Sequence, residues 1–293
     1  MTHQLDPGEG LAEEFVTLPD GRRLRTVVAG AGPEPLVVFE NGISAPAAEW
    51  VHTQREVATR ARTLGYDRAG YGGSDPDDAD RSLPRLADDL TALLDALGET
   101  APVVLVGHSW GGPIIRLFAD RHPARVAGLV FVDATLAEVM SPGAARLVAT
   151  SFRVFGALAA VGATGPIGRI VLPHGMSPEI SAADGAIMLR DFSSRRALRA
   201  ARREAAQIID SLPLLQQLQA TGTPDVPTVC LQAGRVDRGT TKSRPIFNRA
   251  AGELMSAAPQ GRMVVVEDCG HLIPQESPAA VREAVFEVLA AAS

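Results

Sequence analysis

The chain has 293 residues, 46% of them hydrophobic, and a formal net charge of −6. This length permits a large buried core and suggests one or two domains. The acidic balance, without a long run of like charge, argues against nucleic acid as a partner. The two cysteines, Cys230 and Cys269, lie far apart and show neither a metal-binding spacing nor a disulfide framework. We therefore expect two buried free thiols.

The first ten residues are polar and lack the apolar region of a secretory signal. No uninterrupted apolar run reaches the length of a membrane span, since the nearest candidate, residues 154–161, is short and follows Arg153. The sequence therefore predicts a cytoplasmic protein without a membrane span. It carries no signal for an oligomeric state.

Strand and helix patterns alternate through the first half of the chain. Two alternating runs joined by Pro19-Asp20-Gly21 predict a β-hairpin. Apolar runs then predict strands, and apolar residues at helical spacing predict helices. The strands are expected at 36–39, 63–66, 102–106 and 125–132, and the helices at 49–61, 83–97 and 113–122. Such alternation implies right-handed βαβ units and a parallel sheet, with the hairpin adding antiparallel strands at one edge.

The alternation breaks after residue 135. From 136 to 222 the sequence has helical stretches punctuated by prolines and no clear strand. The sheet pattern then resumes, with strands expected at 227–233 and 262–267 and helices at 245–258 and 278–291. The predicted organisation is a first core part at 1–135, a helical cap at 136–222 and a second core part at 223–293.

The segment Gly107-His108-Ser109-Trp110-Gly111, followed by Gly112, reads G-x-S-x-G. It lies between a predicted strand and a predicted helix, which is the context of a nucleophile elbow. Side chains at the glycine positions would collide with neighbouring backbone, while the serine is held at the apex of a strained turn. Ser109 is therefore the candidate nucleophile. The alternative is a glycine-rich strand-to-helix turn with an incidental serine.

A serine hydroxyl needs a base, and the base needs an acid that orients it. His271 follows the last predicted strand, so its loop is expected at the same sheet edge as Ser109. It is the candidate base, with a solvated loop histidine as the alternative. Two strand-end carboxylates compete for the acid: we favour Asp237 and keep Asp133 as the alternative. The other of the two is expected to be a helix cap or a turn residue.

An oxyanion needs two hydrogen-bond donors. The backbone N–H of Trp110 is one candidate, because it follows the nucleophile. The second should come from the loop after the third strand, Asn41-Gly42-Ile43, where Gly42 permits close approach. We expect the N–H of Ile43 to fill this role.

Together these motifs resemble an α/β-hydrolase of the capped serine esterase or lactonase kind, related to epoxide hydrolases, haloalkane dehalogenases and cofactor-free haloperoxidases. The resemblance covers nearly the whole chain, through Glu40-Asn41-Gly42, residues 67–75 and 107–112, Gly234 to Asp237, and Gly270-His271. It implies an eight-stranded, mostly parallel sheet with a helical cap inserted after the sixth strand. One departure is Asn41-Gly42, where the family usually has His-Gly; it concerns the polar lining of the oxyanion loop.

The residue at the nucleophile position distinguishes this chain from some of these relatives. Epoxide hydrolases and dehalogenases use an aspartate at the elbow, whereas this chain has Ser109, and its only tyrosines, Tyr66 and Tyr71, lie outside the predicted cap. The sequence therefore predicts a serine hydrolase for a small to medium apolar carboxylic ester or lactone, with no cofactor and no metal. Perhydrolysis, C–C bond hydrolysis, and a lyase or cyclisation step remain alternatives on the same triad. A non-catalytic binding protein is the alternative from another class.

The predicted cap contains two biased segments. The apolar residues between Leu147 and Leu172, among them Val154, Val161 and Ile170, are expected to pack on the core or to line an apolar pocket. The segment from Arg190 to Arg203 is rich in arginine. We interpret it as a solvated helix face, with binding of an acidic group as the alternative.

Overall fold

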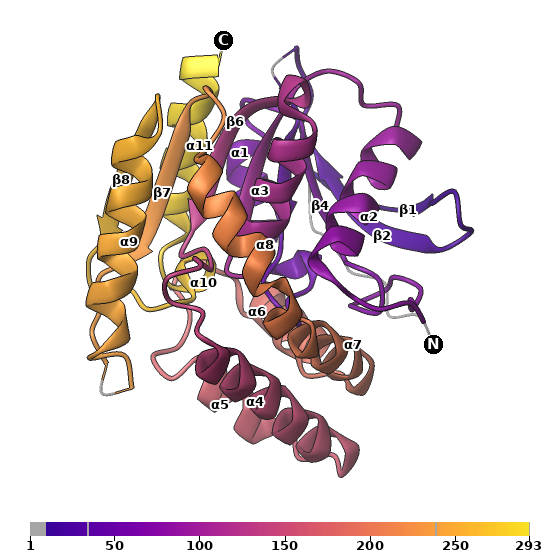
Figure 1. The fold of residues 1–293 in the computed structure, drawn as a ribbon. Helices are drawn as coiled ribbons and strands as arrows, with labels where there is room; N and C mark the ends of the chain where they lie inside the picture. The colour runs from indigo at the N-terminus through magenta and orange to yellow at the C-terminus, as the bar shows by residue number, and fades with distance from the viewer. Residues whose placement is uncertain (1–9, 34, 238, 293) are drawn as a thin grey trace.

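The computed structural model describes residues 10–33, 35–237 and 239–292, which are built around one eight-stranded sheet (Figure 1). The strand order is β1-β2-β4-β3-β5-β6-β7-β8. The bounds are β1 (Leu11–Thr17), β2 (Arg23–Ala29), β3 (Val37–Glu40), β4 (Thr63–Tyr66), β5 (Val103–His108), β6 (Val126–Val132), β7 (Thr228–Ala233) and β8 (Gly261–Val266). β2 pairs antiparallel with β1 and β4, and the remaining neighbours are parallel. The predicted sheet, including its antiparallel edge, is confirmed.

Alternating side chains on the central strands form two apolar layers. In β5, Val104 and Val106 pack towards α1 (Val51–Val57) and α11 (Pro278–Ala292) on one face. Val103 and Leu105 point to the other face, which is covered by α2 (Leu83–Ala96), α3 (Gly111–Arg121) and α9 (Ser243–Ala257). Because successive strand residues face opposite sides, a strand that is apolar at every position requires helices on both faces.

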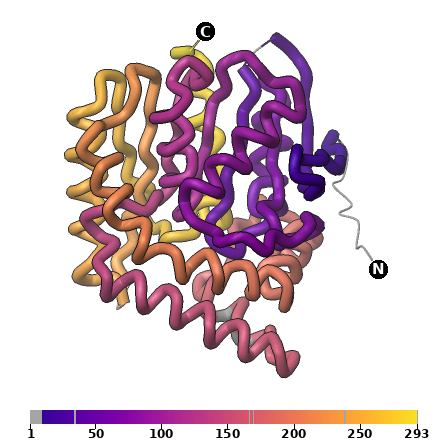
Figure 2. Tube along the Cα trace, turned by 45° about the vertical axis from the view of Figure 1, so that its right-hand side comes forward, coloured from indigo at the N-terminus to yellow at the C-terminus, as the bar shows by residue number. Residues whose placement is uncertain are grey.

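Five helices are inserted between β6 and β7. They are α4 (Pro142–Ala160), α5 (Gly165–Val171), α6 (Ala182–Phe192), α7 (Arg195–Ala206) and α8 (Ile208–Thr221). Serine side chains cap the starts of α4, α6 and α7 by accepting a backbone N–H three residues on. In Figures 1 and 2 the insertion runs along the lower side of the molecule, away from the C-terminus. The expectation of a helical cap after the sixth strand is confirmed, while its division from the core at residues 136 and 222 stays a prediction.

Three short helices complete the described chain: η1 (Ala47–Glu49), η2 (Pro123–Arg125) and α10 (Ile273–Glu276). The predicted polar character of the N-terminal segment concerns residues 1–9, which lie outside the described ranges. Among the residues that are described, no helix combines the length and the apolar character needed to cross a bilayer.

A buried ion cluster joins the insertion to the core. Glu204 of α7 is fully buried and accepts hydrogen bonds from Arg68, Arg81 and the hydroxyl of Tyr71 at 2.5, 3.0 and 3.0 Å. Arg68 also donates to Glu40, at the end of β3, at 2.6 Å. Burial raises the pKa of Glu204, but the charges of Arg68 and Arg81 and their hydrogen bonds lower it further, so the net pKa lies below its ordinary value. The cluster therefore holds two arginines against two carboxylates.

The arginine-rich segment is a solvated face only in part: Arg199 and Arg202 are exposed, whereas other arginines bind the core. The guanidinium of Arg203 donates to the backbone carbonyls of Asp77, Asp78 and Ala79 at 2.6–2.7 Å. Arg196 donates to the carbonyl of Ser74 in the same loop. The solvated-face interpretation is thus wrong for these arginines, because α7 lies against the loop after β4 and its long side chains supply that loop with hydrogen-bond donors.

The apolar part of the insertion divides into buried and exposed side chains. Phe152 and Ile167 are buried. Val154, Val161 and Ile170 are 52%, 78% and 59% exposed, so the expectation that they pack on the core or line a pocket is wrong for these three. They lie on the outer side of helices whose opposite sides are packed.

We predict that the buried ion cluster contributes to the stability of the fold. Glu204→Gln should lower the free energy of unfolding by about 3–5 kcal/mol, because it leaves two buried arginines facing the single carboxylate of Glu40. Urea unfolding followed by circular dichroism would measure this. The matched control is Glu253→Gln, in an exposed pair with Arg249, which should leave the unfolding midpoint unchanged. Equal midpoints for both variants would contradict a structural role for the cluster.

Candidate active site

Ser109 lies at the apex of the turn from β5 into α3. Its φ of +52° is rare for a residue with a side chain, and neighbouring hydrogen bonds hold it there. Its N–H donates to the carbonyl of Val132 at 3.1 Å, and its carbonyl accepts from the N–H groups of Gly112 and Thr135 at 3.1 and 2.9 Å. The strained conformation is therefore fixed from both sides, as a nucleophile elbow requires.

The glycines around Ser109 are required by close backbone contacts. A Cβ on Gly107 would lie 2.7 Å from the carbonyl oxygen of Gly111, and one on Gly111 would lie 2.5 Å from that of Glu40. A Cβ on Gly112 would lie 2.3 Å from the Cβ of Ala134. No side chain fits at these positions without displacing backbone, so the elbow packs directly against β3 and the end of β6.

His271 lies between Ser109 and Asp133. Its Nε2 is 3.0 Å from the Oγ of Ser109, and its Nδ1 is 2.6 Å from the Oδ2 of Asp133. An ionised carboxylate can only accept, so Nδ1 carries the proton and Nε2 is left to accept from the serine hydroxyl. The structure thus brings together two of the residues favoured from the sequence and the carboxylate that was kept as the alternative.

The expectation that Asp237 orients His271 is wrong in this structure. Asp237 lies four residues beyond the end of β7, and its side chain is 41% exposed. Its carboxylate contacts Arg235 at 3.3 Å and the Nε2 of His174 at 3.4 Å. Its backbone N–H donates to the hydroxyl of Thr240. The loop after β7 therefore carries this carboxylate outward, whereas Asp133 directly follows β6 beside the elbow strand.

The carboxylate of Asp133 is fully buried, and hydrogen-bond donors offset the cost of burying its charge. Arg244 of α9 donates to its Oδ2 at 2.9 Å, and the N–H of Ala233 donates to its Oδ1 at 3.1 Å. Burial raises the pKa of the Asp133 carboxyl, but the hydrogen bonds and charges of His271 and Arg244 lower it more, and the net pKa falls well below its ordinary value. This carboxylate therefore remains ionised while it holds the imidazole. Sequence reasoning missed Arg244, which no motif marks.

The loop after β3 approaches the serine closely. A Cβ on Gly42 would lie 3.1 Å from the Nδ1 of His108, a tight contact, and 3.4 Å from the Cβ of Ser109. Within the described chain, the N–H groups of Ile43 and Trp110 donate to no other group. Asn41, where the family usually has histidine, donates from Nδ2 to the carbonyl of Tyr66 at 2.6 Å. Its side chain thus links this loop to the end of β4.

A second histidine, His108, lies beneath the site. It is 2% exposed and contacts the carboxylate of Glu49 and the backbone carbonyl of His271. Sequence reasoning assigned no role to either side chain. The available signal was the position of His108 beside the nucleophile, but nothing in the sequence links it to Glu49.

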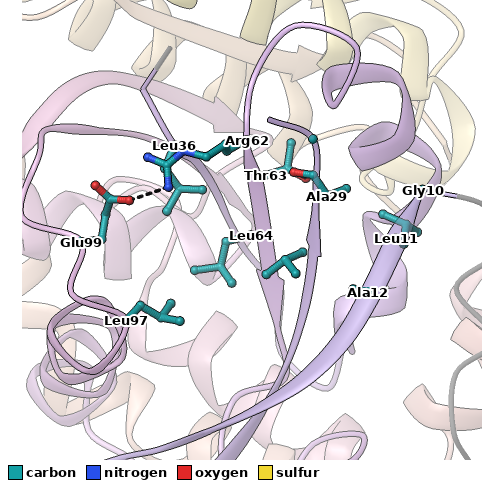
Figure 3. Close-up of a pocket in the computed structure, with 12 residues that line it drawn as sticks. Gly10, Leu11, Ala12, Ala29, Leu36, Arg62, Thr63, Leu64, Leu97 and Glu99 are labelled. Atoms are coloured by element: carbon teal, nitrogen blue, oxygen red, sulfur yellow. Dashed lines mark hydrogen bonds and ion pairs between the residues drawn. The ribbon is translucent and has the colours of Figure 1, made fainter. Parts of the chain in front are cut away.

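One hollow lies at the sheet edge away from Ser109. This hollow, of about 460 Å³, is shown in Figure 3 and is lined by Leu36, Thr63 and the ion pair between Arg62 and Glu99. These residues stand at the starts of parallel strands, at the edge away from Ser109. Ligands of such sheets bind at the carboxyl ends of the strands, so this hollow is separate from the candidate site.

The second hollow, of about 600 Å³, lies within the insertion. Its lining comes from the end of α4, from α5, and from the junction of α6 and α7. Phe192 is one of the lining residues, and its carbonyl accepts a hydrogen bond from the hydroxyl of Ser44 at 3.0 Å. One hydrogen bond therefore connects a lining residue to the residue after Ile43, while Ser109 and His271 are not among the lining residues.

The two cysteines have no part in the candidate site. Cys230 and Cys269 are buried free thiols, as expected. Burial raises the pKa of each thiol to about 12. In the ranges that the structure describes, no three His, Cys, Asp or Glu side chains form an arrangement that could hold a metal ion.

A family model described as the alpha/beta hydrolase family matches residues 37–284. Epoxide hydrolase 4 of Mus musculus is 32% identical over 148 residues, which are 48% of this chain and 41% of that protein. The chain spans less than half the length of the curated relatives it matches.

Solved structures share the fold over the whole chain. Cfl2 of Burkholderia cenocepacia superposes with a TM-score of 0.77 at 23% identity and covers 97% of both chains. A thermophilic esterase of Thermogutta terrifontis superposes with a TM-score of 0.72 at 24% identity, covering 96% of this chain and 99% of its own. At this level of identity the superpositions establish the fold alone.

Proposed function

The chain belongs to the alpha/beta hydrolase family, and on that premise we propose that it is a serine hydrolase acting through an acyl-enzyme on Ser109. We propose as its substrate a small to medium apolar carboxylic ester or lactone. The observation that carries the proposal is the continuous line of hydrogen bonds from Ser109 through His271 to Asp133, at 3.0 and 2.6 Å. Nucleophile, base and orienting acid are already within the reach that proton transfer needs.

In the proposed first step, the Oγ of Ser109 attacks the carbonyl carbon of the ester while its proton passes to the Nε2 of His271. The imidazolium so formed is stabilised by the ionised Asp133 at Nδ1. His271 then returns the proton to the departing alkoxide, which leaves the acyl group on Ser109. Water attacks the acyl-enzyme in the second step and passes a proton to His271, which returns it to the Oγ of Ser109 as the bond to the acyl carbon breaks and the acid is released.

The negative charge on the carbonyl oxygen requires donors already in place. We assign this role to the N–H groups of Ile43 and Trp110. Support comes from the close approach of Gly42 to Ser109 and from the absence of another acceptor for either N–H among the described residues. Trp110 also precedes the first turn of α3, whose N-terminal end favours negative charge.

The tyrosines argue against epoxide opening, the reaction for which several of the relatives are named. Tyr66 and Tyr71 are fully buried, and their hydroxyls donate to Glu40 and Glu204 respectively. Burial, followed by the charge of the adjacent carboxylate, raises the pKa of both phenols. Neither hydroxyl is therefore free to protonate an epoxide oxygen, which favours acyl transfer for this chain.

We assign the apolar part of the substrate to the hollow within the insertion, because Ser44 links its lining to the loop of Ile43. Leu189, Phe192 and Ala159 give it an apolar wall. Arg190 and Arg195 also line it, so binding of an acidic substrate group by the arginine-rich segment stays a prediction. A cytoplasmic location likewise stays a prediction.

The first test is hydrolysis of a p-nitrophenyl ester series from acetate to decanoate. We expect turnover by the native protein and a loss of about 10⁶-fold in kcat for Ser109→Ala, because the nucleophile is removed. A fluorophosphonate probe should label the native protein and not the variant. Labelling without ester turnover would move the assignment to another reaction of the same triad. If the folded protein is not labelled and does not hydrolyse any ester, catalysis by Ser109 is contradicted.

The acid is tested by a matched pair of variants. Asp133→Asn should lower kcat by about 10⁴-fold, because an amide in place of the carboxylate favours the wrong imidazole tautomer and does not stabilise the imidazolium. Asp237→Asn should keep kcat within about threefold, since its side chain has no contact with His271. The opposite ranking in steady-state kinetics would restore Asp237 as the acid.

The hollow is tested by filling it. Gly168 lies on α5, and a Cβ there would be 3.6 Å from the Leu189 side chain, an ordinary contact. Gly168→Leu should therefore fold and shift the optimum of the ester series towards shorter chains. Gly156→Leu, on α4 and with open space around its Cβ, is the control for the change in helix propensity. An unchanged optimum in Gly168→Leu would place the acyl chain elsewhere.

A further inference from the structure

His108 connects two loops that meet at Ser109. Its Nε2 lies 3.0 Å from the backbone carbonyl of His271, and its Nδ1 lies 2.8 Å from the Oε1 of Glu49. The other carboxylate oxygen of Glu49 accepts from the N–H of Gly42, at 3.3 Å, in the loop after β3. A single chain of contacts therefore runs from the backbone of His271 to the residue before Ile43.

The hydrogen-bond partners of His108 indicate which of its ring nitrogens carry a proton. The backbone carbonyl of His271 has no proton to donate, so Nε2 of His108 donates to it; Nδ1 also donates when Glu49 is a carboxylate. Both side chains are 2% exposed, and a buried charge of either sign requires a partner. Burial lowers the pKa of His108, but the charge and the hydrogen bond of Glu49 raise it more, and the net pKa lies above its ordinary value. An imidazolium facing a carboxylate satisfies both requirements.

We propose that Glu49 and His108 form a buried carboxylate–imidazolium pair that positions His271 and the loop of Ile43 relative to Ser109. The proposal rests on the proposed function, since it gives these residues a part in the same reaction. Neither side chain touches the reacting atoms: both are positioning residues. His108 holds the backbone of the base, and Glu49 holds the loop that carries the proposed oxyanion donor.

The position of His108 in the motif places the pair directly beside the nucleophile and the base. His108 is the last residue of β5, directly before Ser109, and its ring centroid is 5.0 Å from that of His271. The loop of His271 has a second brace on its other side, where the N–H of Gly270 donates to Glu276 at 3.0 Å. Loss of the His108 contact should therefore shift the base without unfolding its loop.

Two amide substitutions separate the contacts of His108. The Gln side chain can place its Nε2 where the ring Nε2 stands, so His108→Gln keeps a donor for the carbonyl of His271. The shorter Asn side chain reaches only the Nδ1 position, so His108→Asn keeps the contact with Glu49 and loses the contact with the base loop. His122→Asn, at the C-terminal end of α3 and half-buried, is the control for loss of a histidine.

The readout is the reaction of Ser109 with a fluorophosphonate, resolved into maximal rate and half-saturating concentration. His108→Asn should lower the maximal rate by about 10²-fold, the effect of a misplacement near 1 Å, and leave the half-saturating concentration unchanged. His108→Gln should recover most of the rate, and His122→Asn should match the native protein. Equal rates for the Asn and Gln variants, or a change in thermal midpoint alone, would overturn the positioning role.

A second measurement decides the charge of the pair without any reaction. The ¹⁵N chemical shifts of the His108 ring, assigned by their loss in His108→Gln, should show both nitrogens protonated at pH 7. A ring nitrogen without a proton would overturn the imidazolium. If the native protein reacts with neither ester nor fluorophosphonate, the proposed function fails, while the ring shifts still report on the pair.

Discussion

The turn from β5 into α3 depends on backbone contacts that leave no room for side chains. Gly107 and Gly111 face each other across the turn, and Gly111 also packs on the carbonyl of Glu40. This contact brings the end of β3 against the elbow, so the close approach of the two segments that carry the proposed oxyanion donors is set by main-chain packing. The polar residue before Gly42 can then differ from the family pattern. Asn41 serves instead to join this loop to β4 through the carbonyl of Tyr66.

Charges buried around the turn are arranged in compensated groups. Asp133 faces both His271 and Arg244, and Glu49 faces His108. Isolated buried charges would be expensive, and even paired ones add little net stability compared with apolar packing. Their effect is geometric, because each pair fixes the direction of a hydrogen bond near Ser109. The site is therefore held by charges that restrict position, while the sheet and its apolar layers supply the stability.

The sequence predicted what local patterns encode. Alternation of strands and helices gave the sheet and the inserted helices, and the spacing of small residues gave Ser109 and its turn. The acid could not be chosen this way, since Asp133 and Asp237 both follow strands, and only the path of the loop after β7 turns Asp237 outward. The contact between Glu49 and His108 joins residues 59 positions apart and leaves no local signal. The contacts of Arg196 and Arg203 with the core could not be predicted, because their acceptors are backbone carbonyls, which no side-chain pattern reveals.

The two halves of the insertion are attached to the core differently. Among the described residues, ion pairs to the core come from Asp184 and Asp191 on α6, Glu204 on α7, and His174 and Glu179 between α5 and α6. Helices α4 and α5 instead expose apolar side chains on their outer side. The wall of the hollow formed by α6 and α7 is therefore fixed relative to Ser109, and α4 is joined to that wall through the hydrogen bond from Arg195 to the carbonyl of Ala159, at 2.9 Å. Substitutions on α4 and α5 can accordingly change the size of the hollow without moving the serine, its base or the proposed oxyanion donors.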